Sequence, residues 1–181
     1  GYGDLANELI KSCEVNQYSF LDLSQEVLDY LKNRFDYGTK NNYFVHDANF
    51  TLKGLAIETQ DIIISSHVIE HLQDPLSHLK DIYDFLNVDG IALISTPNLD
   101  SIDSINLGHD WRGYKDETHI SILGYRELKN YLIAHNFEII YGGTSPRYLL
   151  EFLQQKKLKS LFFSKFQLGD SSNFLIKKRK G

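Results

Sequence analysis

Two histidines and a glutamate lie close together in the segment His67-Val-Ile-Glu70-His71, directly after an apolar run. Imidazole titrates near neutral pH, so it can take a proton from a substrate hydroxyl or ligate a metal. The spacing His-x-x-Glu-His is also a zinc signature, with the glutamate as base. A third zinc ligand would then come from a later carboxylate such as Glu138 or Glu151. Such a motif belongs inside a helix, whereas His67 follows a predicted buried strand, so we expect no metal cofactor.

A second group of residues suits a nucleoside ligand. Gly1-Tyr2-Gly3 opens a predicted helix, and this arrangement lets the backbone approach a bulky ligand near the free N–H groups of the first turn. Asp22 ends the next predicted strand, where its carboxylate can accept hydrogen bonds from both ribose hydroxyls. With Ala6 in its last position, the loop also fits the relaxed dinucleotide fingerprint. The spacing favours an adenosine ligand and leaves the cofactor class open.

Residues 99–120 form a third region with functional side chains and no regular apolar period. A loop of this length is uncommon unless it is functional or mobile. Trp111 could either pack into the core and hold the loop in place or form one side of a substrate pocket. His119 suits either a general base or a hydrogen-bonding role at the start of the next helix. Tyr114 lies between them and is a further candidate for substrate contact.

The elements that must position these residues alternate along the chain. Helices are predicted over about 25–35, 76–86 and 121–135, the first of them with Ser24 as its N-cap. Strands are predicted at 18–23, 43–45, 61–66, 91–95, 137–141 and 173–178. This rhythm implies an α/β fold with a doubly wound, mostly parallel sheet. Ligands of such sheets bind beyond the carboxyl ends of the strands, where Asp22 and His67 fall.

The length, charge and cysteine content of the chain argue against several classes of function. The chain has 181 residues, which predicts one domain over 1–181. Its net charge of −5 argues against a nucleic-acid partner, since such a partner needs a basic face. No apolar run approaches the roughly 20 residues that span a bilayer. The single cysteine fits a reducing compartment, so we expect a cytoplasmic protein.

The stretch from Asp61 to Asn98 resembles the class I S-adenosylmethionine-dependent methyltransferases, especially the bacterial group that acts on small molecules and glycan intermediates. It carries His-Val-Ile-Glu-His-Leu after a buried strand, then Asp-Pro, a helix, and a strand that ends in Ser-Thr-Pro-Asn. Where the family usually has the turn Lys-Pro-Gly-Gly, this chain has Asn87-Val88-Asp89-Gly90. The similarity extends over nearly the whole chain, and the final Phe174-Leu-Ile-Lys-Lys resembles the family's last antiparallel strand.

The resemblance implies a Rossmann-like fold, S-adenosylmethionine as cofactor, and methyl transfer, expected to be to oxygen, on a small-molecule or glycan acceptor. Implied catalytic bases are His119 and then His71, and implied acceptor contacts are Trp111 and Tyr114. The implied cofactor contacts are Gly1, Gly3, Asp22, Leu23, Asp47, Ala48, Ser66 and His67. The family's first strand and the start of its glycine loop are missing from the sequence, so we expect the natural chain to start earlier.

Two other functions stay open. Tyr125 and Lys129 are four residues apart on a predicted helix, as in short-chain dehydrogenases, so a nicotinamide-dependent oxidoreductase is one alternative. Hydride transfer of that kind needs a serine on a preceding strand, and no predicted strand supplies one at a suitable place. The second alternative is a non-catalytic domain that keeps the fold.

Residues 149–166 form a basic amphipathic segment. Such a segment can lie on a membrane surface, but we favour a helix that packs on the domain as a cap.

Overall fold

A computed structural model describes residues 2–4, 6–7, 16–35, 41–145 and 167–179. These residues divide into two compact units, Gly1–Ile57 and Glu58–Gly181. Gly1 and the predicted basic segment 149–166 lie outside the described residues. No helix in the described part of the chain is both long and apolar enough to cross a membrane.

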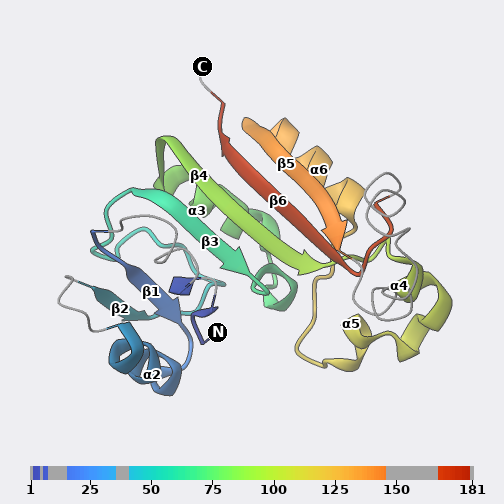
Figure 1. The fold of residues 1–181 in the computed structure, drawn as a ribbon, viewed down its shortest axis with the longest axis horizontal. Helices are drawn as coiled ribbons and strands as arrows, with labels where there is room; N and C mark the ends of the chain where they lie inside the picture. Colours follow the sequence, from blue (N-terminus) through green and yellow to red (C-terminus); the bar gives the residue numbers. More distant parts are fainter. Residues whose placement is uncertain (1, 5, 8–15, 36–40, 146–166, 180–181) are drawn as a thin grey trace. The chain divides into compact units, whose positions relative to one another are not determined.

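The first unit contains a parallel pair of strands and one helix. Strand β1 (Ser19–Asp22) pairs with β2 (Asn42–Val45), and α2 (Gln25–Phe35) connects them along the chain (Figure 1). The backbone N–H of Val27 donates to the Ser24 side chain at 3.4 Å, which confirms Ser24 as the helix cap. Leu28, Leu31 and Phe35 are buried, and Phe20 and Tyr43 of the strands pack against them. The apolar period of α2 therefore provides the core that holds the two strands.

The second unit is built on a four-stranded sheet. Its order is β3 (Gln60–Ser66), β4 (Leu86–Pro97), β6 (Ser171–Lys178) and β5 (Phe137–Ser145). Strands β3 and β4 are parallel, whereas β6 runs antiparallel to both β4 and β5. The antiparallel final strand expected from the sequence is confirmed. Among the described residues, β1 pairs only with β2, and β3 only with β4.

Helices α3 (Pro75–Phe85) and α6 (Tyr125–Ala134) lie on the same face of this sheet (Figure 1). The Asp74 side chain caps α3 by accepting from the N–H groups of Leu76 and Ser77. Strand side chains alternate between faces, so every second residue points toward the helices. The resulting core lies between sheet and helices and contains Leu79, Ile82, Ala92, Ile94, Leu128, Leu132, Phe137, Phe174 and Ile176.

Three expectations about element boundaries were wrong. Residues 99–120 are not irregular throughout, since they contain α4 (Ile102–Leu107), η2 (Gly108–Asp110) and α5 (Arg112–Lys115). These helices are too short to show a helical period in the sequence. The predicted turn at 87–90 belongs to β4, with Asp89 at a positive φ of 69°. Helix α6 begins at Tyr125 rather than Ser121, because the backbone at its N-cap, Gly124, is extended, with a ψ of 153°.

Candidate functional site

In the first unit, four of the predicted cofactor residues gather at the carboxyl ends of β1 and β2. Asp22 ends β1 beside Val45 of β2, and Asp47 and Ala48 follow β2 after one intervening residue, His46. The Asp22 carboxylate accepts from the N–H of Ser24 at 2.9 Å, which fixes its orientation. The contact with Ser24 is compatible with ribose binding, since a carboxylate can accept about four hydrogen bonds. Leu23 is 70% exposed, so it can cover a bound ring.

Asp47 is held by the turn that follows β2. One of its side-chain oxygens accepts from the backbone N–H of Asn49 at 2.9 Å and from the Asn49 side chain at 3.0 Å. Its carbonyl accepts from the N–H of Phe50 at 2.9 Å. Because β1 and β2 are parallel, Asp22 and Asp47 lie at the same edge of the pair, as ribose and adenine contacts would require.

Gly3 has a structural reason to be glycine. Its φ is +78°, and an added Cβ would lie 2.7 Å from the Phe35 ring and 2.8 Å from Leu31. The N-terminal segment is also tied to α2, since Arg34 donates to the Tyr2 carbonyl at 2.6 Å and to Asp4 at 2.9 Å. The glycine therefore lets this segment pack closely on α2, and this packing requires glycine independently of any role in ligand binding.

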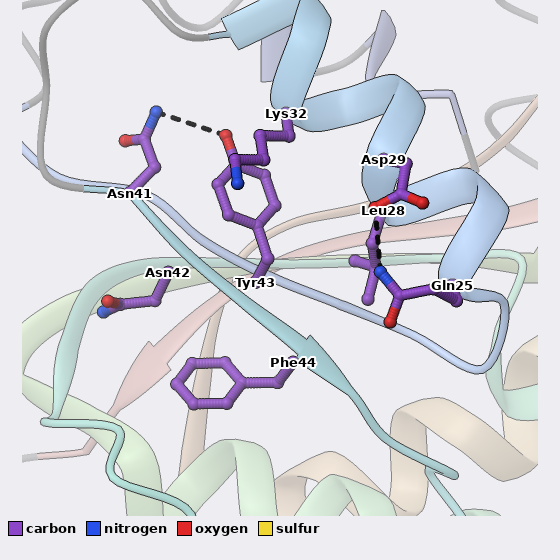
Figure 2. Close-up of a pocket in the computed structure, with 8 residues that line it drawn as sticks. All are labelled: Gln25, Leu28, Asp29, Lys32, Asn41, Asn42, Tyr43 and Phe44. Carbon is purple, nitrogen blue, oxygen red and sulfur yellow. Dashed lines mark hydrogen bonds between the residues drawn. The ribbon is translucent and has the colours of Figure 1, made fainter.

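A shallow hollow on the first unit does not coincide with these residues. It lies between α2 and β2 and is lined by Gln25, Leu28, Asp29, Lys32, Asn41, Asn42, Tyr43 and Phe44 (Figure 2). Figure 2 shows the Gln25 amide donating to Asp29 across one side of it. None of the predicted cofactor residues lines the hollow, so we do not assign the cofactor to it.

In the second unit, the end of β3 is held in an unusual conformation. His67 follows the last strand residue, Ser66, and has a positive φ of 54°. Its N–H donates to the Ser95 carbonyl of β4 at 2.8 Å. Backbone strain of this kind persists only where surrounding contacts enforce it, and it concentrates at functional sites. The side chain of His67 is 52% exposed, and its Nδ1 lies 2.9 Å from Oε1 of Glu70.

Glu70 connects three segments of the second unit. It lies in the short helix η1 (Ile69–His71) and is fully buried. Its Oε2 accepts from the Thr96 hydroxyl at 3.1 Å, close to the end of β4. Its carbonyl accepts from the N–H groups of Ile120 and Ser121 at 2.9 and 3.0 Å. One residue therefore holds the ends of β3 and β4 and the chain after α5 together.

The two predicted bases, His71 and His119, lie next to each other. Their ring centroids are 4.8 Å apart, and the rings meet edge to face at 67°. Nδ1 of His119 lies 2.8 Å from the Gly113 carbonyl, and Nδ1 of His71 lies 2.9 Å from the Thr118 hydroxyl. The sequence places these histidines 48 residues apart, and the fold brings them to one edge of the sheet.

Their hydrogen bonds determine which ring nitrogens can accept a proton. A carbonyl can only accept, so Nδ1 of His119 carries the hydrogen and donates it to Gly113. The Thr118 hydroxyl donates to Asp116, so it accepts from Nδ1 of His71. In the neutral rings, the lone pair of each histidine is therefore on Nε2.

Asp116 completes this network with a negative charge. Its Oδ2 lies 3.6 Å from Nε2 of His119. The hydroxyl of Thr118 lowers the pKa of Asp116, helped by the backbone N–H of Thr118 and by the positive charges that His119 and His71 can carry. A proton taken up by His119 would consequently be stabilised by a neighbouring carboxylate. This arrangement can remove a proton from a hydroxyl group.

The family model for the methyltransferase domain matches residues 1–141 of the chain. The chain belongs to this methyltransferase family. Its cofactor is S-adenosylmethionine. The Rossmann-like class I fold expected from the sequence is confirmed. A comparison with curated proteins gives no match.

Solved structures with the same fold have low sequence identity to this methyltransferase. The plantazolicin methyltransferase BpumL, in complex with SAH, is 19% identical at a TM-score of 0.64, with 99% of this chain and 74% of that chain covered. The N-methyltransferase NodS from Bradyrhizobium japonicum is 10% identical at a TM-score of 0.62, with 99% and 82% covered. The cyclase SpnF is 14% identical at a TM-score of 0.65, with 100% and 73% covered.

The two predicted acceptor contacts of the methyltransferase differ in exposure. Trp111 is 2% exposed, and its Nε1 donates to Asp170 at 2.7 Å, so in this structure it anchors the segment to the core. Tyr114 packs edge to face on Trp111 and is 46% exposed. An added Cβ at Gly113 would lie 2.2 Å from the Trp111 ring, so glycine is needed there. Contact of Trp111 with an acceptor stays a prediction.

The sequence did not single out three residues that organise this site. Thr96, Asp116 and Thr118 received no predicted role, because small polar residues and surface acids are common and their types alone do not indicate a function. Thr96 lies inside the Ser-Thr-Pro-Asn signature, which could have identified it. Asp116 and Thr118 become informative only when the fold places them beside His71 and His119.

Proposed function

We propose that this methyltransferase transfers a methyl group to a hydroxyl oxygen of a small molecule or glycan intermediate. The observation that carries the proposal is the pair of hydrogen bonds that holds His119 and His71 with their Nε2 lone pairs available. A hydroxyl nucleophile must lose its proton as its bond to carbon forms, and imidazole is suited to accept that proton. An amine acceptor would need no such base.

The predicted cofactor residues fit S-adenosylmethionine chemically. Asp22 offers a carboxylate to the ribose hydroxyls, Asp47 offers one to the adenine amino group, and Leu23 and Ala48 offer apolar surface. In the second unit, Ser66 ends β3 and His67 follows it, and we assign them to the methionine end of the cofactor. When bound, S-adenosylmethionine supplies an electrophilic methyl group. The protein then contributes mainly alignment and removal of a proton.

In the proposed step, Nε2 of His119 would take the hydroxyl proton of the acceptor as the bond from the acceptor oxygen to the methyl carbon forms and the bond from that carbon to sulfur breaks, which leaves the demethylated cofactor as product. The imidazolium formed is stabilised by Asp116, 3.6 Å away. Nδ1 keeps its hydrogen bond to Gly113, so the ring does not turn as it gains charge. His71 lies edge to face with His119 and is the second candidate for the base. The ring of Tyr114, which is 46% exposed, offers an aromatic surface to an acceptor.

The test is single-turnover methyl transfer from S-adenosylmethionine carrying a labelled methyl group, over a panel of phenols, monosaccharides and amines. We expect a hydroxyl acceptor, and we expect His119→Gln to transfer roughly 10²–10⁴ times more slowly. Cofactor affinity, measured by titration calorimetry, should not change. His135→Gln is the matched control, because His135 is an exposed histidine hydrogen-bonded to the Tyr131 carbonyl on α6.

Three outcomes would overturn the proposal. Full turnover by both His119→Gln and His71→Gln with a hydroxyl acceptor would mean that the base lies elsewhere. Turnover with amines alone would replace oxygen by nitrogen as the acceptor atom. Cofactor binding without turnover on any acceptor would favour a role for the fold other than methyl transfer.

A further inference from the structure

We propose that Glu70, His71 and His119 form a binding site for a divalent transition-metal ion of the zinc type. One ligand atom from each residue lies within 4.8 Å of the other two. Within the described ranges, no other three histidine, cysteine, aspartate or glutamate side chains form such a group. The proposal goes beyond methyl transfer and does not depend on it, since metal binding can be measured without cofactor or acceptor.

The hydrogen bonds of the two histidines prepare them as ligands. Metal-bound histidines almost always donate their second ring N–H to a carbonyl, carboxylate or water. His119 makes such a bond from Nδ1 to the Gly113 carbonyl at 2.8 Å. His71 makes the equivalent bond from Nδ1 to Thr118, whose hydroxyl is in turn bonded to Asp116. Both rings thus offer Nε2 in the tautomer that a metal requires.

Glu70 supplies the third donor from a fixed position. It is fully buried, and its two oxygens are oriented by His67 at 2.9 Å and by Thr96 at 3.1 Å. A ligating carboxylate is normally hydrogen-bonded in this manner by the residues around it. A cation at this point would also offset the cost of burying a negative charge.

The donor set indicates the class of ion. Two imidazoles and one carboxylate, with a fourth position open, are the ligands of several catalytic zinc sites. Imidazole favours zinc, copper, nickel and iron over magnesium and calcium. Bonds of about 2.0–2.1 Å place tetrahedral ligand atoms about 3.4 Å apart. The widest pair must therefore close by up to about 1.4 Å from 4.8 Å, which small rotations of the side chains can supply.

This site differs from the zinc motif in the sequence. That motif used His67 and His71 as ligands with Glu70 as base. In the structure the ring of His67 is hydrogen-bonded to Glu70, and the second imidazole comes from His119 in the segment after α5. No spacing in the sequence joins His119 to the motif, because the residues meet only in the folded chain.

The experiment titrates Zn²⁺ into the chelator-stripped 181-residue chain in competition with a chromophoric chelator. The Cys13→Ser variant is the background, so that the thiol contributes no binding. We expect one equivalent of Zn²⁺ to bind. His71→Gln and His119→Gln should each weaken binding at least about 100-fold, because loss of a direct ligand exceeds the 10–100-fold effects of outer contacts. His109→Gln and His135→Gln should bind like the background protein.

Circular dichroism of each variant establishes that it is folded, so weak binding cannot be attributed to unfolding. Co²⁺ provides a second readout, since its visible absorption should indicate a tetrahedral site with nitrogen and oxygen ligands and should disappear in the His71→Gln/His119→Gln double variant. The proposal is wrong if that double variant binds Zn²⁺ as tightly as the background protein. It is equally wrong if the background protein shows no saturable binding.

Discussion

Oε1 of Glu70 lies 2.9 Å from Nδ1 of His67, although Glu70 is fully buried and the side chain of His67 is 52% exposed. The pair links a carboxylate inside the protein to an imidazole at its surface. Removing one partner of a buried polar pair leaves the other without compensation, and this is costly. The contact therefore stabilises the end of β3 and holds the strained backbone of His67 in place.

We predict that Glu70→Gln lowers the free energy of unfolding by about 1.5–3 kcal/mol, because hydrogen bonds to a charged group are lost. Urea denaturation measures this, and Glu127→Gln on the exposed side of α6 is the matched control. In a double-mutant cycle with His67→Gln, the two losses should differ from additivity by at least about 0.5 kcal/mol. Fully additive losses would show that the Glu70–His67 contact contributes nothing to stability.

Asp22→Asn should weaken S-adenosylmethionine binding roughly 10–100-fold, because two ribose hydroxyls lose a charged acceptor worth about 1.5–3 kcal/mol. Asparagine keeps an oxygen that can accept from the Ser24 N–H, so the local fold is retained. Titration calorimetry provides the measurement, and Asp29→Asn on α2 is the control in the same unit. Equal affinities for Asp22→Asn and the unmodified chain would remove Asp22 from the cofactor site.

The Trp111→Phe substitution tests whether Trp111 holds its segment to the core or contacts the acceptor. The substitution removes the hydrogen bond from Nε1 to Asp170 at 2.7 Å, so we expect about 1–3 kcal/mol less stability and unchanged cofactor affinity. Asp170→Asn, which keeps an acceptor oxygen, should cost less. A higher KM for the acceptor without any loss of stability would instead identify Trp111 as a substrate contact.

The sequence predicted the fold well wherever one local pattern determined an element. The run Asp61-Ile-Ile-Ile-Ser-Ser is apolar and β-branched, and β3 covers it. The apolar period after Ser24 corresponds to α2. Such segments have a single favourable way to bury their side chains, so the chain itself contains enough information.

The site was less predictable because its parts come from separate segments. His71 and His119 were each recognised as candidate bases, but their edge-to-face contact depends on the path of the chain after α5. That path is fixed by bonds from Ile120 and Ser121 to the Glu70 carbonyl, and backbone groups of this kind have no sequence signature. The extended backbone at Gly124 makes helix α6 begin later than its apolar period predicted.

Thr118→Val should raise the pKa of Asp116 toward its ordinary value, since the hydroxyl of Thr118 is the main cause of the lowered pKa. A carboxyl group whose pKa is lowered by folding stabilises the protein above about pH 4, and this contribution disappears as the pH falls through the lowered pKa. The stability difference between Thr118→Val and the unmodified chain should therefore be present at pH 6 and shrink in acid. Carboxyl NMR titration of Asp116 checks the shift, with Thr118→Ser as the control that keeps the hydroxyl.

Zinc should inhibit methyl transfer to a hydroxyl acceptor if both proposals hold. The Nε2 atom of His119 that accepts the proton is also the proposed metal ligand, so a bound ion removes the base. Metal and proton compete for the same lone pair, so inhibition should weaken as the pH falls. Single-turnover rates measured with added Zn²⁺ and then with a chelator provide the test. Restoration of the rate by the chelator is expected, whereas a rate that rises with Zn²⁺ would mean that the metal activates the acceptor itself and that His119 is not its base.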